Sequence, residues 1–390
     1  MPNISKDIAS LKGQPMFKIL TKCKELERKG TFIKHFELGD PDFDTPYSVT
    51  QKAINSLNNG NTHYQSSRGD LDFLNSVQNT TQISRNFTPE IEQITVTTGA
   101  NAAIFYTLKT ICDQGDEIIL PNPYFPTYIA AAHLAGVKCK FYTLNIENNF
   151  KPSIKEINSL ITPKTKAILI NSPSNPMGSI VGKEQLIEIY NIARDKDIYI
   201  LSDEVYARMV YINNFEFFSI SELDKCLERT ILINGFSKAY AMTGWRVGIA
   251  IAPKNVSEKI TLLSESIVSC VPGFVQEAAK EALLLPQEET KKMYDKFRNR
   301  QLNLIEEFNK IEGFDCLIPE GAMYVFPSIK GITTDSEKFA LHLLQSSGIA
   351  CVPGVYFGDS GEGHLRFSCA GCENNIIGLA KSITAAIQTY

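Results

Sequence analysis

The stretch "TILINGFSKAYAMTGWRVGIAIAP" (residues 230–253) joins two aliphatic runs through a segment that carries one lysine and one arginine. Neither run alternates with polar residues, which is typical of strands that are covered on both faces of a sheet. Between the runs, Lys238 and Arg246 stand among small and apolar neighbours, whereas a surface loop usually carries Ser, Asn and Asp beside its charges. The stretch therefore predicts two buried strands that meet at a functional site.

Five similar apolar runs lie between residues 90 and 252, and most of them are separated by segments long enough for crossover helices. These runs are "QITVT", "DEIILP", "KCKFYTL", "KAILIN" and "IYILSD". Together with the first two runs they predict an α/β fold, with a mainly parallel seven-stranded sheet sandwiched by helices. Helical spacing over residues 14–29 and a charged amphipathic run after residue 285 predict two helices outside this sheet.

The composition is that of an ordinary globular protein, with 390 residues and a net charge of −4. This charge argues against a nucleic-acid or anionic-membrane partner. The nine cysteines are irregularly spaced and indicate reduced thiols, and the pair Cys369 and Cys372 has no second pair or histidine cluster that would predict a metal. We find no signal peptide and no apolar run long enough for a membrane span, so we expect a cytoplasmic protein.

Polar residues follow four of the predicted strands. They are Thr98-Gly99-Ala100-Asn101, Ser172-Pro173-Ser174-Asn175-Pro176, Asp203-Glu204-Val205-Tyr206 and Gly235-Phe236-Ser237-Lys238. In open α/β sheets, ligands bind at the carboxyl ends of the strands. A lysine that can form a Schiff base, a carboxylate for a ring nitrogen, a helix N-terminus and an arginine for a phosphate together meet the needs of pyridoxal phosphate. A dinucleotide enzyme is set aside because no G-x-G-x-x-G follows any strand.

The segment "SKAYAMTGWRVG" (237–248) resembles the lysine signature of class I aminotransferases of pyridoxal phosphate fold type I. From about residue 10 to the C-terminus, the chain resembles the branch that contains bacterial aspartate aminotransferases. The resemblance implies a large cofactor-binding domain (46–284) and a smaller α+β domain built from both termini, namely an N-terminal segment (1–45) and residues 285–390. It also implies a homodimer with shared active sites.

The resemblance further implies a role for each candidate site residue. Lys238 would form the internal aldimine and shuttle a proton, Asp203 would pair with the pyridinium nitrogen, and Tyr206 would hydrogen-bond the ring 3′-oxygen. The other expected cofactor contacts are Asn175 at the same oxygen, Phe125 stacked on the ring, Gly99, Ala100, Asn101 and Arg246 at the phosphate, Ser237 beside the lysine, and Tyr64 at the phosphate of the partner subunit. Arg366 would bind the substrate α-carboxylate, with Gly39 and Asn175 closing that end of the pocket.

The resemblance implies a ping-pong transaminase that moves the amino group of an L-amino acid to a 2-oxo acid such as 2-oxoglutarate. The amino donor stays open, because Asn101 stands where that branch places a lysine that reaches a distal carboxylate. Gln14 and Met16 also replace small hydroxyl residues, and Gly235 replaces a serine at the phosphate. Aspartate is therefore one candidate beside alanine, methionine and aromatic amino acids, which a pocket edged by Met16, Phe17 and Tyr324 would tolerate. Arg68 or Arg208 could restore a preference for acidic side chains.

Three other functions use a similar fold. β-Elimination on a cysteine conjugate or cystathionine would use the same Lys238 and Asp203. A non-catalytic effector-sensing domain would need a DNA-binding module ahead of the cofactor domain, and the residues before the resemblance are too few for one. The sugar substrate of a sugar-nucleotide aminotransferase would offer no α-carboxylate for Arg366 to bind. The sequence thus favours the transaminase.

Overall fold

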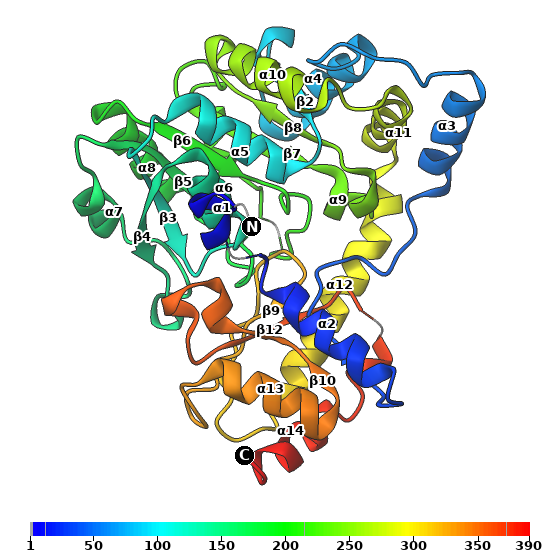
Figure 1. The fold of residues 1–390 in the computed structure, drawn as a ribbon, viewed down its shortest axis with the longest axis vertical. Coiled ribbons are helices and arrows are strands. Elements are labelled where there is room, and N and C mark those ends of the chain that lie inside the picture. The colour runs from blue at the N-terminus through cyan, green and yellow to red at the C-terminus, as the bar shows by residue number, and fades with distance from the viewer. Residues whose placement is uncertain (1–2, 12, 214, 372) are drawn as a thin grey trace.

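A computed structural model describes residues 3–11, 13–213, 215–371 and 373–390 of the chain (Figure 1). Its α-helices are α1 (Lys6–Ser10), α2 (Met16–Glu27), α3 (Tyr47–Asn58), α4 (Leu71–Arg85), α5 (Ala100–Ile111), α6 (Thr127–Ala135), α7 (Ile154–Leu160), α8 (Lys183–Asp195), α9 (Phe236–Ala239), α10 (Lys254–Val268), α11 (Gly273–Leu284), α12 (Gln287–Phe308), α13 (Ser336–Ser347) and α14 (Leu379–Ile387). Its strands are β1 (Lys34–His35), β2 (Ile94–Thr97), β3 (Glu117–Asn122), β4 (Lys138–Thr143), β5 (Thr165–Asn171), β6 (Tyr199–Asp203), β7 (Thr230–Gly235), β8 (Gly248–Ile251), β9 (Tyr324–Val325), β10 (Ile349–Ala350), β11 (Val352–Pro353) and β12 (Leu365–Ser368).

The central sheet has seven strands in the order β2-β8-β7-β6-β5-β3-β4, which confirms the predicted fold class. Strands β4, β3, β5, β6 and β7 pair in parallel. Strand β8 runs antiparallel to both of its neighbours, β2 and β7. All seven strands are those that the apolar runs predicted, with ends that differ by at most a few residues.

Helices cover both faces of this sheet, as the continuous aliphatic runs require. On one face, helices α5, α6 and α10 pack against side chains such as Leu120, Leu169 and Ile231. On the other face, α7 and α8 cover the β3–β6 region, while α3, α4 and α11 cover β2, β7 and β8. The hydrophobic effect of burying both faces therefore stabilises the scaffold that carries the site.

A second body is built around the long helix α12, which runs in Figure 1 from below α11 down to the small sheets. There β1 pairs in parallel with β10, and β9, β12 and β11 form a three-stranded antiparallel sheet. Helix α2 packs its apolar face on the same body, because Ile19, Cys23 and Ile33 form one cluster with Leu344 and Ala350. These contacts support the predicted small domain of two chain ends, whose boundaries at 45 and 284 stay predictions.

The strands of this second body are two to four residues long, much shorter than the apolar runs "GAMYVFPSI" (321–329), "IACVPGVYFG" (349–358) and "HLRFSCAG" (364–371) that contain β9 to β12. The middle run splits at Cys351 into β10 and β11, which belong to different sheets. Pro353 and Gly354 end it, because proline offers no N–H and a β-carbon on Gly354 would lie 1.9 Å from the carbonyl oxygen of Gly361. Alternation of apolar residues alone could not reveal this change of sheet.

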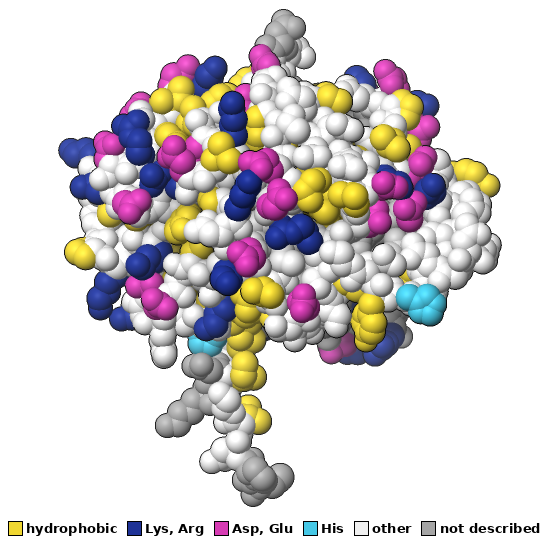
Figure 2. Space-filling view, turned by 90° about the horizontal axis from the view of Figure 1, so that it is seen from above, with side chains coloured by type: hydrophobic (Ala, Val, Ile, Leu, Met, Phe, Trp, Pro, Cys, Tyr) yellow, Lys and Arg dark blue, Asp and Glu magenta, His cyan; other side chains and the backbone are white. Residues whose placement is uncertain are grey.

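None of the described helices is long and apolar enough to cross a membrane. On the face that Figure 2 shows, cationic and anionic side chains are interspersed, and the described residues of that face form no large patch of one sign. Cys369 is buried as a free thiol, whereas Cys372 lies outside the described residues.

Candidate active site

The ends of four strands lie side by side at one edge of the central sheet. Gly235 at the end of β7 pairs with Gly248 at the start of the antiparallel β8, and Gly248 also pairs with Thr97 at the end of β2. Asp203 at the end of β6 pairs with Ile233 of β7 and with Asn171 at the end of β5. The register therefore brings the predicted strand-end residues to one edge, as the rule for open α/β sheets requires.

Lys238 lies on the short helix α9 directly after β7, and its side chain is partly buried. Its Nζ donates a hydrogen bond of 2.5 Å to the carbonyl oxygen of Gly39, which comes from the N-terminal loop. Burial lowers the pKa of Lys238 to about 8, partly opposed by Asp40 and assisted by the cations Arg366 and Arg246. A lysine with such a pKa offers a substantial fraction of free amine near neutral pH, which is the nucleophilic form.

Asp203 is 5% exposed and holds two hydrogen bonds. The Tyr128 hydroxyl donates to Oδ2 over 2.6 Å, and the Val205 N–H donates to Oδ1 over 3.2 Å. Burial raises the pKa of Asp203 to about 6, against the lowering effect of these two donors. A carboxylate that is costly to ionise inside the protein binds strongly to any cationic N–H that reaches it.

Arg246 lies against the turn that opens helix α5. A β-carbon on Gly99 would be 2.5 Å from Arg246 Nη2, and Gly99 has φ of +94°, so glycine is required there for two reasons. The guanidinium also donates to the Thr243 carbonyl oxygen over 2.8 Å. Because the first turn of a helix leaves N–H groups without intrahelical partners, Gly99, Ala100, Asn101 and Arg246 together form a suitable anion cradle.

Arg366 on β12 is 1% exposed, and its guanidinium joins three parts of the chain. Nη1 donates to Asn175 Oδ1 over 3.1 Å, and Nη2 donates to the Glu37 carbonyl oxygen over 2.6 Å. The guanidinium also lies over the Tyr324 ring, 4.5 Å from its centroid. Its Nε is buried without a hydrogen-bond partner among the described residues, so this buried cation still has a donor for an anionic ligand.

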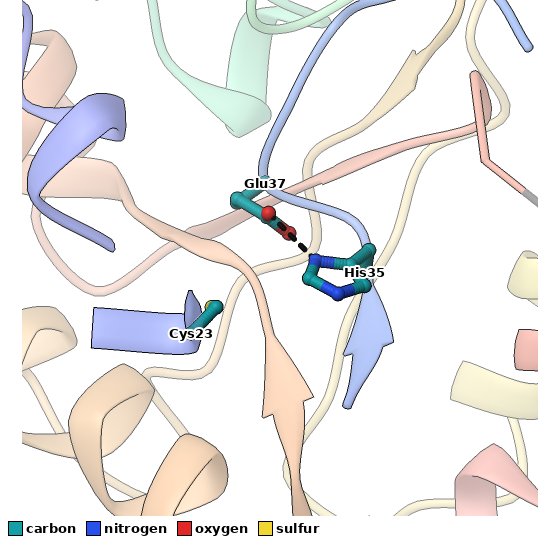
Figure 3. Close-up of side chains that lie close together, drawn as sticks. All are labelled: Cys23, His35 and Glu37. Atoms are coloured by element: carbon teal, nitrogen blue, oxygen red, sulfur yellow. Dashed lines mark hydrogen bonds and ion pairs between the residues drawn. The ribbon is translucent and has the colours of Figure 1, made fainter. Parts of the chain in front are cut away.

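Glu37 connects this arginine to a cluster with Cys23 and His35, the group of described residues that could ligate a metal ion (Figure 3). Glu37 is 1% exposed, and its Oε1 lies 2.8 Å from His35 Nδ1. His35 Nε2 lies 3.0 Å from Glu27 Oε1, so both ring nitrogens already have carboxylate partners. We therefore interpret the cluster as ion pairs that support the Arg366 end of the site.

The hydrogen bond with Glu37, and less strongly that with Glu27, raises the pKa of His35 to about 9 despite its burial. Because this value exceeds the unfolded value of about 6.5, the ion pairs stabilise the fold fully below pH 6.5 and lose this effect as the pH rises towards 9. In urea unfolding across this range, we expect the stability gap between the wild type and His35→Gln to shrink with rising pH. His63→Gln, which removes an exposed histidine, is the control. A gap that stays constant from pH 6 to 9 would contradict the charged pair.

Other predicted residues lie in less decisive surroundings. Phe125 packs edge-to-face on Tyr128, with ring centroids 5.7 Å apart, and Ser237 is half-buried next to Lys238. Tyr64 is 86% exposed. Arg68 donates to the carbonyl oxygens of Glu92 and Ile94, at the start of β2, so it serves the end of the strand opposite the site. Arg208 is exposed and stacks on Tyr240, 5.3 Å from its ring centroid.

The sequence profile of the family "Aminotransferase class I and II" matches residues 35–382 of the chain. The chain belongs to this family. The match contains every strand-end motif described above and the Arg366 strand, and it begins next to the loop that supplies Gly39. This aminotransferase is thus an enzyme that transfers amino groups, and its family implies pyridoxal phosphate as the cofactor.

Relatives of this aminotransferase include proteins with different stated substrates. The chain is 34% identical to an aspartate aminotransferase of Musicola paradisiaca, over 96% of this chain and 94% of that protein. It is 37% identical to aromatic-amino-acid aminotransferase 2 of Thermococcus litoralis, over 85% of this chain and 86% of that protein. The crystal structure of an aspartate aminotransferase from Rhizobium meliloti has a TM-score of 0.94 at 29% identity, covering 100% and 99% of the two chains.

The sequence predicted no site role for Tyr128, Glu37 and His35, and it predicted Tyr324 only as a pocket edge. A signal existed for two of them, because residues two apart in an extended segment point to the same side, as His35 and Glu37 do. Phe125 precedes helix α6, in which Tyr128 lies, so helical spacing does not connect these two residues and Tyr128 had no comparable signal. The contacts of Tyr324 depend on how the second body meets the central sheet, which no local pattern reports.

Proposed function

We propose that this aminotransferase uses pyridoxal 5′-phosphate to move the amino group of an L-amino acid to a 2-oxo acid such as 2-oxoglutarate, in two half-reactions at one site. Lys238 carries the proposal, because a partly buried amine with a pKa of about 8 stands at the sheet edge where β6 ends in the buried Asp203. A solvated lysine would keep its ordinary pKa and would be a poor nucleophile at neutral pH.

The residues present fit the cofactor at two points and its substrate at a third. The anion cradle of Gly99 and Arg246 suits its phosphate, and Asp203 suits a protonated ring nitrogen. The unpaired Nε of Arg366 suits the α-carboxylate of a substrate that lies next to it. When bound, pyridoxal phosphate supplies an aldehyde that exchanges amines and a ring that withdraws electrons from the carbon bearing the amino group.

The side chains would then share the tasks of the reaction. Lys238 Nζ would move the proton from the substrate α-carbon to the cofactor carbon that takes the amino group, and would carry it back in the second half-reaction, with its amine oriented by the Gly39 carbonyl oxygen. Asp203 would keep the ring nitrogen protonated, while Tyr206 and Asn175 would hydrogen-bond the ring oxygen and Phe125 would pack on the ring. Arg366 orients the carboxylate, assisted by Asn175 and Gly39, and Arg246, Ser237 and the α5 turn hold the phosphate.

We also propose a homodimer, because the exposed Tyr64 matches a residue that reaches the phosphate of the partner subunit in the resembled branch. An acidic donor would lose a charge-assisted contact of about 1.5–3 kcal/mol at Asn101. Neither Arg68 nor Arg208 supplies a substitute, since each is engaged elsewhere. We therefore propose that apolar and aromatic amino acids are better donors than aspartate.

The test is a single turnover of the enzyme loaded with pyridoxal phosphate. One amino acid without an oxo acid should bleach the aldehyde form of the bound cofactor, and added 2-oxoglutarate should restore it. Pyruvate and ammonia formed without an acceptor would instead indicate β-elimination. In a panel of phenylalanine, methionine, alanine and aspartate, we expect aspartate to react at least about tenfold more slowly than phenylalanine, the equivalent of 1.4 kcal/mol. Aspartate as the fastest donor would contradict the substrate proposal.

A further inference from the structure

Tyr324 contacts several residues of the predicted site, although it was predicted only as an edge of the pocket. Its hydroxyl lies 2.8 Å from the hydroxyl of Tyr206, and the two rings meet edge-to-face at 5.8 Å. A β-carbon on Gly39 would lie 2.1 Å from the Tyr324 hydroxyl, so this hydroxyl also rests on the loop that binds Lys238. The ring lies beneath the Arg366 guanidinium.

The position of Tyr324 is fixed from several sides. It lies on β9 and pairs with Ser368 of β12, the strand that carries Arg366. The Gln301 side chain donates to the Tyr324 carbonyl oxygen over 3.1 Å, and the residue is 2% exposed. A side chain held by its backbone, its ring and a close backbone neighbour has little freedom to reorient, so its hydroxyl is a preorganised hydrogen-bonding group.

The direction of the hydrogen bond between the two tyrosines follows from counting protons. A phenol hydroxyl has one proton to donate. If Tyr206 donates its proton to the cofactor ring oxygen, as the proposed function requires, its own oxygen can only accept. Tyr324 must then donate to Tyr206, and each hydrogen bond in such a chain strengthens the next.

We propose that Tyr324 is a positioning residue that donates its hydroxyl proton to Tyr206 and thereby strengthens the hydrogen bond from Tyr206 to the cofactor. Because the Tyr324 ring also supports Arg366, this residue joins the substrate carboxylate site to the ring oxygen site. The inference rests on the proposed function, since it assumes that Tyr206 faces the cofactor.

The test reads the cofactor directly. The chromophore formed by pyridoxal phosphate and Lys238 changes its absorbance with pH, which gives a spectroscopic pKa. In the deprotonated form of the chromophore, the ring oxygen carries a negative charge that the lost proton no longer balances. A hydrogen-bond donor to this oxygen stabilises that form and therefore lowers the spectroscopic pKa. Tyr206→Phe should therefore raise the spectroscopic pKa, and Tyr324→Phe should raise it by about a third as much.

Two further variants make the test specific. Tyr211→Phe is the matched control, because the Tyr211 hydroxyl is also buried but has no hydrogen-bond partner among the described residues; it should leave the spectroscopic pKa unchanged. In the double variant of Tyr206 and Tyr324, the second change should add nothing, since Tyr324 acts through Tyr206. Tyr324→Phe keeps the ring under Arg366, so kcat should fall a few-fold with an unchanged KM.

The outcomes separate the inference from the function on which it rests. A shift in Tyr206→Phe with none in Tyr324→Phe overturns the inference alone. An additional shift in the double variant also overturns it, because Tyr324 would then act independently of Tyr206. If Tyr206→Phe leaves the spectroscopic pKa unchanged, Tyr206 does not contact the cofactor, and both the assignment of Tyr206 and the inference fail.

Discussion

Replacing Lys238 by alanine is expected to lower the kcat of transamination by about 10⁴-fold or more, because it removes both the nucleophile and the group that carries the proton. The amine is partly buried and oriented by the Gly39 carbonyl oxygen, so water is poorly placed to substitute for it. Steady-state kinetics with phenylalanine and 2-oxoglutarate give the loss. Lys196→Ala, which removes an exposed lysine, should leave kcat unchanged.

A second measurement shows whether the loss comes from the amine itself. Borohydride should attach the cofactor covalently to the wild type, with a mass gain on the peptide that contains residue 238, and should leave Lys238→Ala unlabelled. The alanine variant should still bind pyridoxal phosphate, because the cradle of Gly99 and Arg246 is untouched. Turnover above about one per cent of the wild type would show that another group carries the proton.

Replacing Asp203 by asparagine is expected to lower kcat by about three orders of magnitude with little change of shape. Asparagine keeps the size of the side chain but removes the charge that would hold a proton on the ring nitrogen. The fold should not suffer: an acid whose pKa is raised to about 6 destabilises the folded state increasingly as the pH rises from 3.8 to 6. We therefore expect the cofactor-free variant to be at least as stable as the wild type at pH 8.

The neighbouring Glu204 gives the matched comparison, since it is also buried but faces a different partner. It accepts two hydrogen bonds from Arg85, at 2.9 and 2.7 Å, and is supported by Ser202 and Ser219. Glu204→Gln breaks this buried ion pair and should cost about 3–5 kcal/mol of unfolding free energy, with kcat close to normal in the molecules that fold. If Asp203→Asn loses stability while keeping its kcat, Asp203 serves the fold and not the cofactor, and the ring nitrogen lies elsewhere.

The sequence alone predicted the strands of the central sheet more accurately than those of the second body. Strands such as β6 were predicted to within one residue, because an unbroken aliphatic run has no stable place except between two layers of helices. The strands β10 and β11 were not, because a two-residue strand contributes no period, and its partner is chosen by distant packing.

The same limit applies within the site. The strand ends that carry Lys238 and Asp203 could be predicted, since parallel strands bring their carboxyl ends to one edge whatever the rest of the chain does. The bonds from Arg366 to Asn175 and between Tyr206 and Tyr324 join residues 191 and 118 positions apart. They depend on how the N-terminal loop and the second body are placed against the sheet, and sequence patterns describe segments rather than their placement.

The reversed strand β8 has a consequence for how tolerant the chain is of length changes. The parallel neighbours β5 and β6, for example, are joined through helix α8, which covers one face of the sheet, so a residue added after α8 can be taken up at a distance from the site. Between the paired Gly235 and Gly248, however, the connection returns directly to the edge from which it left, and it carries both the amine and the guanidinium. One residue inserted there would change the spacing of these two groups. The length of this connection therefore sets the distance between the amine at the bond-forming end of the site and the guanidinium at the phosphate-holding end.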